Sequence, residues 1–309
     1  MTNTTPFELW DTDKEGYEQL ATIDVLPYLF TMQNQFIMAG VMGWPVAHSR
    51  SPAIHNHWIQ HYGLTGAYGL FPVKPQELET AIRGLQALGL AGCNITIPHK
   101  VEAMKFMDWV DPLAQRMGAI NTIVRQPDGA LHGFNNDGFG YIQSLREEQP
   151  TWRADTGPIV ILGAGGASRA ILLSLMDEGA TEVRLLNRTR SKADALAEEF
   201  GSSVTVVDWS ERQNALSSAA LLINTTSQGM HGQSSLDIDL AQLPISAIVS
   251  DAIYIPLETP LLARARLRGN PTVNGLGMLL HQARPAFQAW FGVMPEVTPE
   301  LRQAIIATL

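Results

Sequence analysis

The feature of this sequence that most constrains its fold is a run of small residues joining an apolar segment to a helix-forming one. Residues 159–162 are apolar, and residues 163–169 read Gly-Ala-Gly-Gly-Ala-Ser-Arg. A stretch rich in alanine and leucine follows, and residues 182–186 are suited to a second strand. Strand, glycine-rich turn, helix and strand in this order predict a βαβ unit whose turn binds a dinucleotide.

Small side chains in this turn let backbone amides and a helix N-terminus approach a pyrophosphate. Gly163 allows the chain to turn tightly at the end of the strand. The alternative interpretation is a tight turn with a purely structural role. The candidate cofactor-binding residues of the turn are Gly163, Ala164, Gly165, Gly166 and Ala167.

Residues 187–192, at the end of the second predicted strand, indicate which dinucleotide binds. NAD-binding proteins usually place an acidic residue there to hold the ribose 2'-hydroxyl. This chain instead has Asn-Arg-Thr-Arg-Ser-Lys, which holds three cations and no carboxylate. Guanidinium groups pair well with phosphate, so the segment predicts NADP, with Asn187, Arg188, Thr189 and Lys192 as candidate ligands. Alternatively, these charges are simply solvated at the start of a helix.

Composition limits the class of protein. The chain has 309 residues, 45% hydrophobic and 17% charged, which is typical of a globular protein of about two domains. A formal charge of −9 disfavours a function held to nucleic acid or to a membrane surface by bulk electrostatics. No apolar run approaches the roughly 18 residues of a membrane span. The single cysteine, Cys93, excludes a disulfide framework.

Residues 1–35 contain six acidic residues and one lysine, and lack the basic and apolar regions of a secretion signal. We therefore expect a cytoplasmic protein.

From residue 36, short apolar runs alternate with amphipathic stretches, which predicts a parallel sheet with crossover helices. The predicted strands cover residues 36–41, 67–71, 92–95 and 119–124.

Predicted helices open near Pro52, Gln76, His99 and Pro112, with Ser51 and Asp111 as capping residues. Residues 147–158 are expected to separate the first unit from the dinucleotide-binding unit.

Polar residues gather at three expected strand ends of the first unit, where open α/β sheets place ligands. They lie at residues 48–52, at residues 94–100, and at Asn121 with residues 135–138. Taken singly, each cluster is a weak signal, because serine and aspartate before helices are commonly caps.

Taken together and in order, these motifs resemble the shikimate dehydrogenase family, including its quinate/shikimate dehydrogenases, over about residues 36–290. The matching motifs are His-Ser-x-Ser-Pro at 48–52, Asn-Ile-Thr-Ile-Pro-His-Lys at 94–100, Gly-Ala-Ile-Asn-Thr at 118–122, Asn-Asn-Asp-Gly at 135–138, the glycine turn, Asn-Arg-Thr at 187–189, Asn-Thr-Thr-Ser at 224–227, Asp-Ala-Ile-Tyr at 251–254 and Gly-Leu-Gly-Met-Leu-Leu-His-Gln-Ala at 275–283.

The resemblance implies two α/β domains with a cleft between them. Residues 36–141 together with 277–309 would form an N-terminal substrate-binding catalytic domain, and residues 142–276 a Rossmann-type NADP-binding domain. Residues 1–35 would be an acidic N-terminal extension. The implied activity is the reversible, NADPH-dependent reduction of 3-dehydroshikimate to shikimate.

The resemblance also assigns roles to individual residues. Lys100 and Asp137 would form the catalytic pair. An ammonium group at Lys100 can stabilise the nascent alkoxide and donate a proton to it, so Lys100 is the expected proton donor and Asp137 the alternative. The substrate carboxylate would be held by Ser49, Ser51 and Tyr254. The ring hydroxyls would meet Asn94, Thr96, Asn121, Asp137 and Gln282. Further cofactor contacts would come from Thr225, Gly275 and Met278, although Met278 suits core packing equally well.

Several alternatives remain open. Asn136 stands where the family usually has threonine and could shape the wall facing the ring hydroxyls, which keeps quinate, or both substrates, as an alternative. A non-catalytic NADP sensor is disfavoured because Lys100 and Asp137 are both present. A dehydrogenase for a folate-type substrate would not need Ser49 and Ser51. No metal site is expected, and the chain is expected to be a monomer or homodimer.

Overall fold

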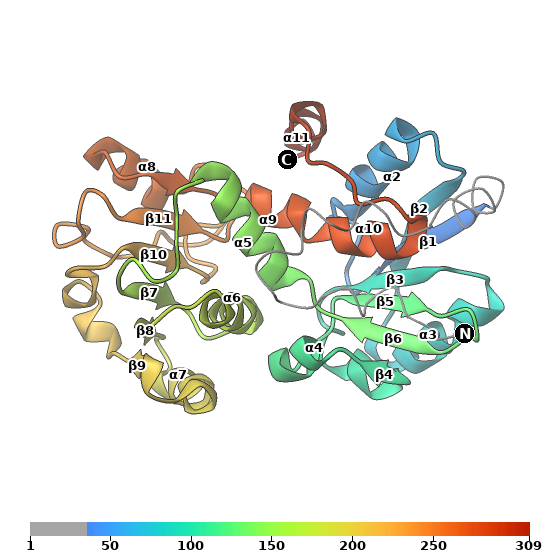
Figure 1. The fold of residues 1–309 in the computed structure, drawn as a ribbon, viewed down its shortest axis with the longest axis horizontal. Helices are drawn as coiled ribbons and strands as arrows, with labels where there is room; N and C mark the ends of the chain where they lie inside the picture. Colours follow the sequence, from blue (N-terminus) through green and yellow to red (C-terminus); the bar gives the residue numbers. More distant parts are fainter. Residues whose placement is uncertain (1–35) are drawn as a thin grey trace.

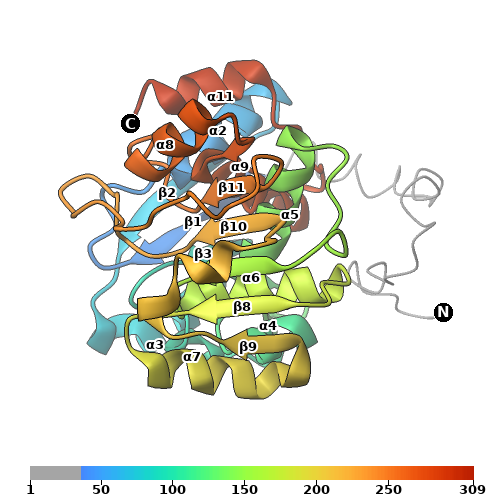
Figure 2. The same ribbon diagram turned by 90° about the vertical axis from the view of Figure 1, so that its left-hand side faces the viewer.

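The structure is a computed structural model that describes residues 36–309, so the predicted acidic extension at residues 1–35 lies outside the described residues. Two six-stranded sheets lie side by side along the long axis of the molecule (Figure 1). Helices α5 (Asp137–Glu148) and α9 (Gly275–His281) run between them. Viewed from one end, β8 (Val183–Leu186) and β10 (Leu221–Asn224) of the second sheet lie in front of β1 (Ile37–Gly43) and β3 (Gly92–Ile95) of the first (Figure 2).

The second sheet confirms the predicted Rossmann-type fold. Its strands are β7 (Ile159–Leu162), β8 (Val183–Leu186), β9 (Val204–Val206), β10 (Leu221–Asn224), β11 (Ile248–Asp251) and β12 (Thr272–Val273). They are all parallel, in the order β12-β11-β10-β7-β8-β9. This is the doubly wound order, in which the chain reverses direction across the sheet between β7 and β10.

Helices cover both faces of this sheet, which explains why β7 is apolar throughout. Ile159 and Ile161 pack into one core cluster, whereas Val160 and Leu162 pack into another on the opposite face. The covering α-helices are α6 (Gly166–Asp177), α7 (Arg190–Ala197) and α8 (Pro260–Arg268), and short 3-10 helices lie at Glu198–Ser203, Trp209–Glu211 and Asn214–Leu216.

The first sheet is mixed, so the predicted parallel arrangement holds for only some of its strand pairs. Its strands are β1 (Ile37–Gly43), β2 (Gly66–Pro72), β3 (Gly92–Ile95), β4 (Trp109–Val110), β5 (Thr122–Arg125) and β6 (Leu131–Phe134), in the order β2-β1-β3-β5-β6-β4. Strand β5 runs antiparallel to both β3 and β6. The turn at Pro127-Asp128-Gly129 joins β5 directly to β6, and such a hairpin needs no crossover helix.

Helix starts in the first unit agree with the prediction only in part. The α-helices are α2 (Ser51–His61), α3 (Leu78–Ala87) and α4 (Pro112–Met117). Asp111 caps α4 as predicted, since its carboxylate accepts from the amides of Leu113 and Ala114. Ser51 does not cap α2 but is its first residue. No α-helix opens near His99. A 3-10 helix covers Glu102–Phe106, and another covers Pro75–Glu77.

The C-terminal helices return to the first sheet. Helices α10 (Ala283–Phe291) and α11 (Pro299–Ile306) lie beside α2 (Figure 1). Phe287 and Trp290 are 0% and 2% exposed and pack with Trp58 and Tyr68 in one core cluster. The Trp290 indole donates a hydrogen bond to the Ile123 carbonyl at 3.1 Å, which ties α10 to β5. Within residues 36–309, we find no helix with both the length and the apolar character needed to cross a membrane.

Candidate active site

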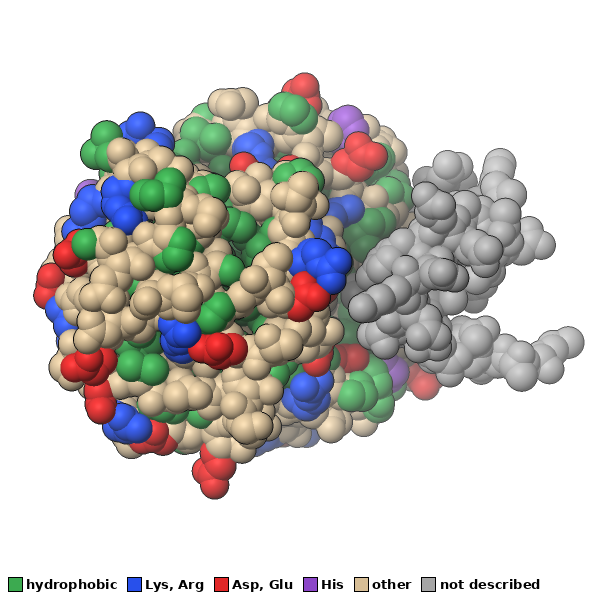
Figure 3. All heavy atoms as spheres, turned by 60° about the vertical axis from the view of Figure 1, so that its left-hand side comes forward, with side chains coloured by type: hydrophobic (Ala, Val, Ile, Leu, Met, Phe, Trp, Pro, Cys, Tyr) green, Lys and Arg blue, Asp and Glu red, His purple; other side chains and the backbone are tan. Residues whose placement is uncertain are grey.

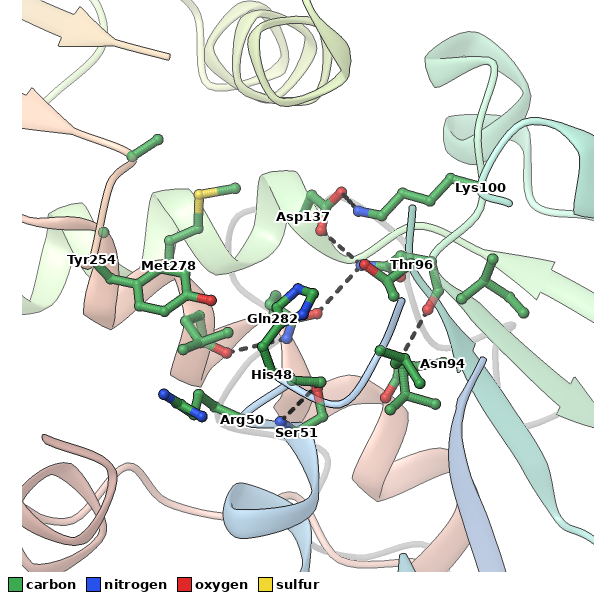
Figure 4. Close-up of a pocket in the computed structure, with 18 residues that line it drawn as sticks. His48, Arg50, Ser51, Asn94, Thr96, Lys100, Asp137, Tyr254, Met278 and Gln282 are labelled. Carbon is green, nitrogen blue, oxygen red and sulfur yellow. Dashed lines mark hydrogen bonds and ion pairs between the residues drawn. The ribbon is translucent and has the colours of Figure 1, made fainter. Parts of the chain in front are cut away.

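A pocket of about 230 Å³ opens between the two sheets (Figure 4). It is bounded by the loop after β1, the end of β3, the start of α5, the segment after β11 and helix α9. Of the residues predicted from the sequence, the pocket wall contains Ser49, Ser51, Asn94, Thr96, Lys100, Asn121, Asp137, Tyr254, Gly275, Met278 and Gln282. The structure therefore brings together the predicted substrate-binding and catalytic side chains.

Close packing of α5 against α9 holds opposite walls of this pocket together. A side chain at Gly277 of α9 would meet the Ser144 hydroxyl of α5 at 2.2 Å. A side chain at Gly140 of α5 would meet the Met278 carbonyl of α9 at 2.7 Å. Because both positions are glycine, the helices can approach closely, which brings the first residue of α5 near the end of α9.

Lys100 and Asp137 form an ion pair at one end of the pocket, with Nζ 2.5 Å from Oδ2. Their side chains are 28% and 15% exposed, so both are largely screened from solvent yet open to a ligand. Asp137 begins α5, where the helix dipole favours a negative charge. The Lys100 carbonyl accepts from the Ile120 amide at 2.9 Å, which fixes the loop that carries the ammonium group.

Amide side chains extend this polar end. Asn121 Nδ2 donates to Asp137 Oδ1 at 2.9 Å and to Gln282 Oε1 at 3.4 Å. Gln282 in turn donates to the Leu279 carbonyl at 3.1 Å. An ammonium group, a carboxylate and two carboxamides offer both donors and acceptors, which suits a ligand with several hydroxyl groups.

The opposite end of the pocket has hydroxyl groups and a cation. The Ser49 hydroxyl accepts from the Ser51 amide at 3.3 Å, and the Tyr254 hydroxyl points into the pocket (Figure 4). Burial raises the pKa of Tyr254, although the positive charge of Arg50 opposes that shift, so the phenol stays protonated and can donate. Donors of this kind suit a carboxylate.

Sequence reasoning missed Arg50 as a site residue. Its side chain lines the pocket and points toward Tyr254, and its Nε atom is buried with no hydrogen-bond partner among the described residues. A cation between two pocket serines was the available signal for its role. Since Lys100 is paired with Asp137, Arg50 can supply positive charge for an anionic group at this end.

The predicted nucleotide-binding turn lies outside this pocket, directly after β7. Gly163 has φ +115°, and a side chain there would meet Thr225 Oγ1 at 2.4 Å. Thr225 follows β10, and its hydroxyl donates to the Leu162 carbonyl at 2.7 Å. In contrast, a side chain at Gly165 or Gly166 would meet nothing within 4 Å. The N-terminus of the 12-residue helix α6 is thus open to a pyrophosphate, so these residues fit a dinucleotide.

The cations after β8 differ in their surroundings. Arg190 pairs with Asp208 at 2.6 Å and with Asp194 at 3.5 Å. Arg188 and Lys192 are exposed and form no ion pair with other described residues. Acidic and basic side chains are interspersed over the face of the molecule shown in Figure 3.

The position of the Asn136 side chain contradicts one expectation about the pocket wall. Its side chain is not among the pocket-lining residues and is directed into the protein, where Nδ2 donates to Thr122 Oγ1 at 3.0 Å. The residue is only 9% exposed. The expectation that Asn136 shapes the wall facing a ring hydroxyl is therefore wrong, and Asn136 no longer supports quinate as an alternative substrate.

Two further side chains that could react chemically, Cys93 and His55, are buried in the protein interior. Cys93 is fully buried, its thiol donates to the Gly40 carbonyl at 3.2 Å, and burial raises its pKa. His55 is fully buried and stacks on Tyr68 with ring centroids 4.1 Å apart, and burial lowers its pKa to about 3. His57 and His61 lie side by side on α2, and among the described residues no group of three metal-ligating side chains forms.

Comparison with known families identifies the family to which the chain belongs. Residues 41–123 match the shikimate dehydrogenase substrate binding domain, residues 147–232 match the shikimate / quinate 5-dehydrogenase family, and residues 275–305 match the shikimate 5'-dehydrogenase C-terminal domain. The chain belongs to the shikimate dehydrogenase family. The motif series had predicted this family, and the prediction is confirmed.

Relatives within the family are close. The shikimate dehydrogenase (NADP(+)) of Paramagnetospirillum magneticum is 52% identical over 276 residues, which cover 89% of this chain and 100% of the relative. That of Rhodospirillum rubrum is 54% identical over 87% of this chain and 96% of the relative.

Solved structures of the family share the fold. The shikimate 5-dehydrogenase of Thermus thermophilus in complex with NADP(H) and shikimate is 35% identical, with a TM-score of 0.78, over 88% of this chain and 100% of that one. The quinate dehydrogenase of Corynebacterium glutamicum in complex with NAD is 29% identical, with a TM-score of 0.82, over 88% and 100% of the two chains.

Proposed function

We propose that this protein catalyses the reversible, NADPH-dependent reduction of 3-dehydroshikimate to shikimate. The observation that carries this proposal is the pairing of Lys100 with Asp137 at one end of a pocket whose other end offers Ser49, Ser51 and Tyr254. A substrate with a carboxylate at one end and hydroxyl groups at the other matches this distribution of donors and acceptors. Relatives about 50% identical carry the same activity in their names.

Different pocket residues bind different parts of the substrate. Ser49, Ser51 and Tyr254 donate hydrogen bonds to the carboxylate of the substrate. The ring hydroxyls and the carbonyl oxygen lie among Asn94, Thr96, Asn121, Asp137 and Gln282. Fixing the ring at both ends orients the reacting carbon, which lowers the entropic part of the barrier.

Lys100 acts on the reacting oxygen. In the reducing direction, the carbonyl oxygen gains negative charge, and the Lys100 ammonium stabilises this charge and donates its proton. Asp137 holds the ammonium in place and accepts a hydrogen bond from Asn121 on its other oxygen. In the oxidising direction, Lys100 takes the proton back from the substrate hydroxyl.

NADP supplies or accepts the hydride when it is bound. The turn from Gly163 to Ala167 and the N-terminus of α6 would hold the pyrophosphate, with Thr225 supporting the turn. The phosphate on the adenosine ribose would be held by Asn187, Arg188, Thr189 and Lys192. Gly275 and Met278 line the substrate pocket from α9 and would contact the nicotinamide.

The assay that tests this proposal follows NADPH absorbance with shikimate and NADP. Lys100→Met removes the ammonium group and should lower kcat by roughly 10² to 10⁴-fold. Lys105→Met is a matched control, because Lys105 pairs with Glu102 on the surface and is 66% exposed. A Lys100→Met variant that kept its kcat and changed only KM would contradict the acid-base role.

Quinate is the second candidate substrate, because the Corynebacterium glutamicum quinate dehydrogenase shares this fold with a TM-score of 0.82. Measuring kcat/KM with shikimate and with quinate, each with NADP and NAD, distinguishes the two activities. Shikimate with NADP should give the highest value. Turnover with neither substrate would instead favour a role in sensing NADP.

We further propose that residues 36–141 with 277–309 act as the catalytic domain and residues 142–276 as the cofactor domain. The protein is proposed to work in the cytoplasm, as a monomer or homodimer, without nucleic acid or membrane partners.

A further inference from the structure

A buried series of hydrogen-bonded polar side chains lies behind the active site. The donor and the acceptor of each hydrogen bond in it can be assigned. It begins at Tyr68, whose hydroxyl donates to Asn94 Oδ1 at 2.6 Å. Burial raises the pKa of Tyr68 well above its ordinary value, so the phenol keeps its proton and acts as a donor. The Asn94 carboxamide is thereby oriented, and its Nδ2 donates to the Asn121 carbonyl at 3.0 Å and to Thr122 Oγ1 at 3.1 Å.

Thr122 receives a second donor from the other side. Asn136 Nδ2 donates to Thr122 Oγ1 at 3.0 Å. A threonine hydroxyl has one proton and two lone pairs, and the two amide donors occupy the lone pairs. Its proton is therefore directed to the remaining neighbour, Asn121 Oδ1, at 2.8 Å. Thr122 is 1% exposed, so water cannot readily replace any of these contacts.

The direction of this bond decides which way Asn121 presents its carboxamide. Its Oδ1 also accepts from the Asn136 backbone amide at 3.1 Å, so two donors hold the oxygen on the buried side. The Nδ2 group must then face the pocket, where it donates to Asp137 Oδ1 at 2.9 Å and to Gln282 Oε1 at 3.4 Å. A reversed carboxamide would set its oxygen against the Asp137 carboxylate.

We propose that Thr122 and Asn136 are positioning residues that fix the carboxamide of Asn121 toward Asp137 and the substrate. The inference rests on the proposed function, since it concerns the residue that contacts the catalytic carboxylate. It also gives Asn136 a role in this chain. Asn136 supplies the second donor that leaves the Thr122 proton only one acceptor.

A double-mutant cycle tests this proposal. Thr122→Val keeps the size of the side chain and removes the hydroxyl, whereas Thr122→Ser keeps the hydroxyl and is the matched control. Thr122→Val should lower kcat/KM for shikimate about ten-fold, as expected for the loss of one buried hydrogen bond. Thr122→Ser should stay within about three-fold of wild type.

The cycle is completed in an Asn121→Ala background, where the carboxamide to be positioned is absent. There, Thr122→Val should lower kcat/KM by less than about two-fold, because its effect passes through Asn121. An equal loss in both backgrounds, or an equal loss in Thr122→Ser, overturns the proposal. Asn136→Ala provides a second cycle if Thr122→Val does not fold, with the same two outcomes. Wild-type turnover of shikimate reports on the proposed function separately.

Discussion

Cofactor selectivity is predicted to depend on Arg188 and not on its neighbour Arg190. Both follow β8, but only Arg188 was among the cofactor ligands expected from the sequence. In the structure, Arg190 is held by Asp208 at 2.6 Å, whereas Arg188 is exposed and forms no ion pair with another described residue. Arg188 is therefore available to a 2'-phosphate without breaking an existing pair, so Arg188→Ala should weaken NADP binding.

The magnitude follows from the exposure of the group. A hydrogen bond to a charged partner contributes about 1.5 to 3 kcal/mol, and solvent screening places an exposed guanidinium at the lower end. A loss of about 1.5 to 2 kcal/mol corresponds to a rise of roughly 10 to 30-fold in the KM for NADP. The KM for NAD, which lacks the 2'-phosphate, should change by less than about two-fold.

Initial rates at saturating shikimate, with NADP and NAD varied in turn, provide the measurement. Arg190→Ala is the matched control and should leave the ratio of kcat/KM for the two cofactors within about three-fold of wild type. The selectivity of the wild-type enzyme should also fall with added salt, because the contact is exposed. If Arg190→Ala reduced selectivity as much as Arg188→Ala, the assignment of the phosphate to Arg188 would be refuted.

Three further predictions concern the turn, the pocket and the core. Gly163→Ala should weaken NADP binding at least about ten-fold in fluorescence titrations, because its φ is +115° and the added carbon would meet Thr225 Oγ1 at 2.4 Å. Arg50→Gln should raise the KM for shikimate about ten-fold and leave the KM for shikimate methyl ester unchanged, since the ester has no charge to pair. Phe287→Ala should reduce the free energy of unfolding by about 3 to 5 kcal/mol in urea titrations, because Phe287 is 0% exposed.

The sequence predicted the second sheet better than the first for a physical reason. Strands β7 and β8 are buried on both faces and lie next to a glycine-rich turn, so local pattern and tertiary position agree. In the first sheet, β6 contains His132 and Gly133 and lacks a strong apolar pattern. Its pairing with β5 depends on the turn at Pro127-Asp128-Gly129, and that turn was not recognised as a hairpin.

The residues of the pocket were predictable because a sequence motif records residue types in order. The pocket gathers Ser49, Lys100, Asp137, Tyr254 and Gln282 from distant parts of the chain. The packing of α9 against α5 brings Gln282 to Asp137, although the two are far apart in sequence. The motifs indicated which side chains belong to the site, but not the glycine contacts that hold the two helices close.

The direction of the Asn136 side chain could not be predicted from the sequence. Its position beside Asp137 suggested a side chain facing the substrate, but Asn136 lies just before the first residue of α5, and its side chain is directed away from the pocket that Asp137 lines. The Asn136 amide meets Thr122 in the interior, where its effect depends on which atom of each pair carries the proton. That direction follows from the number of donors around one hydroxyl, and this number is known only when Asn94, Thr122 and Asn136 are seen together. In the proposed arrangement, Asn136 acts on the substrate through Thr122 and Asn121 and does not line the pocket itself.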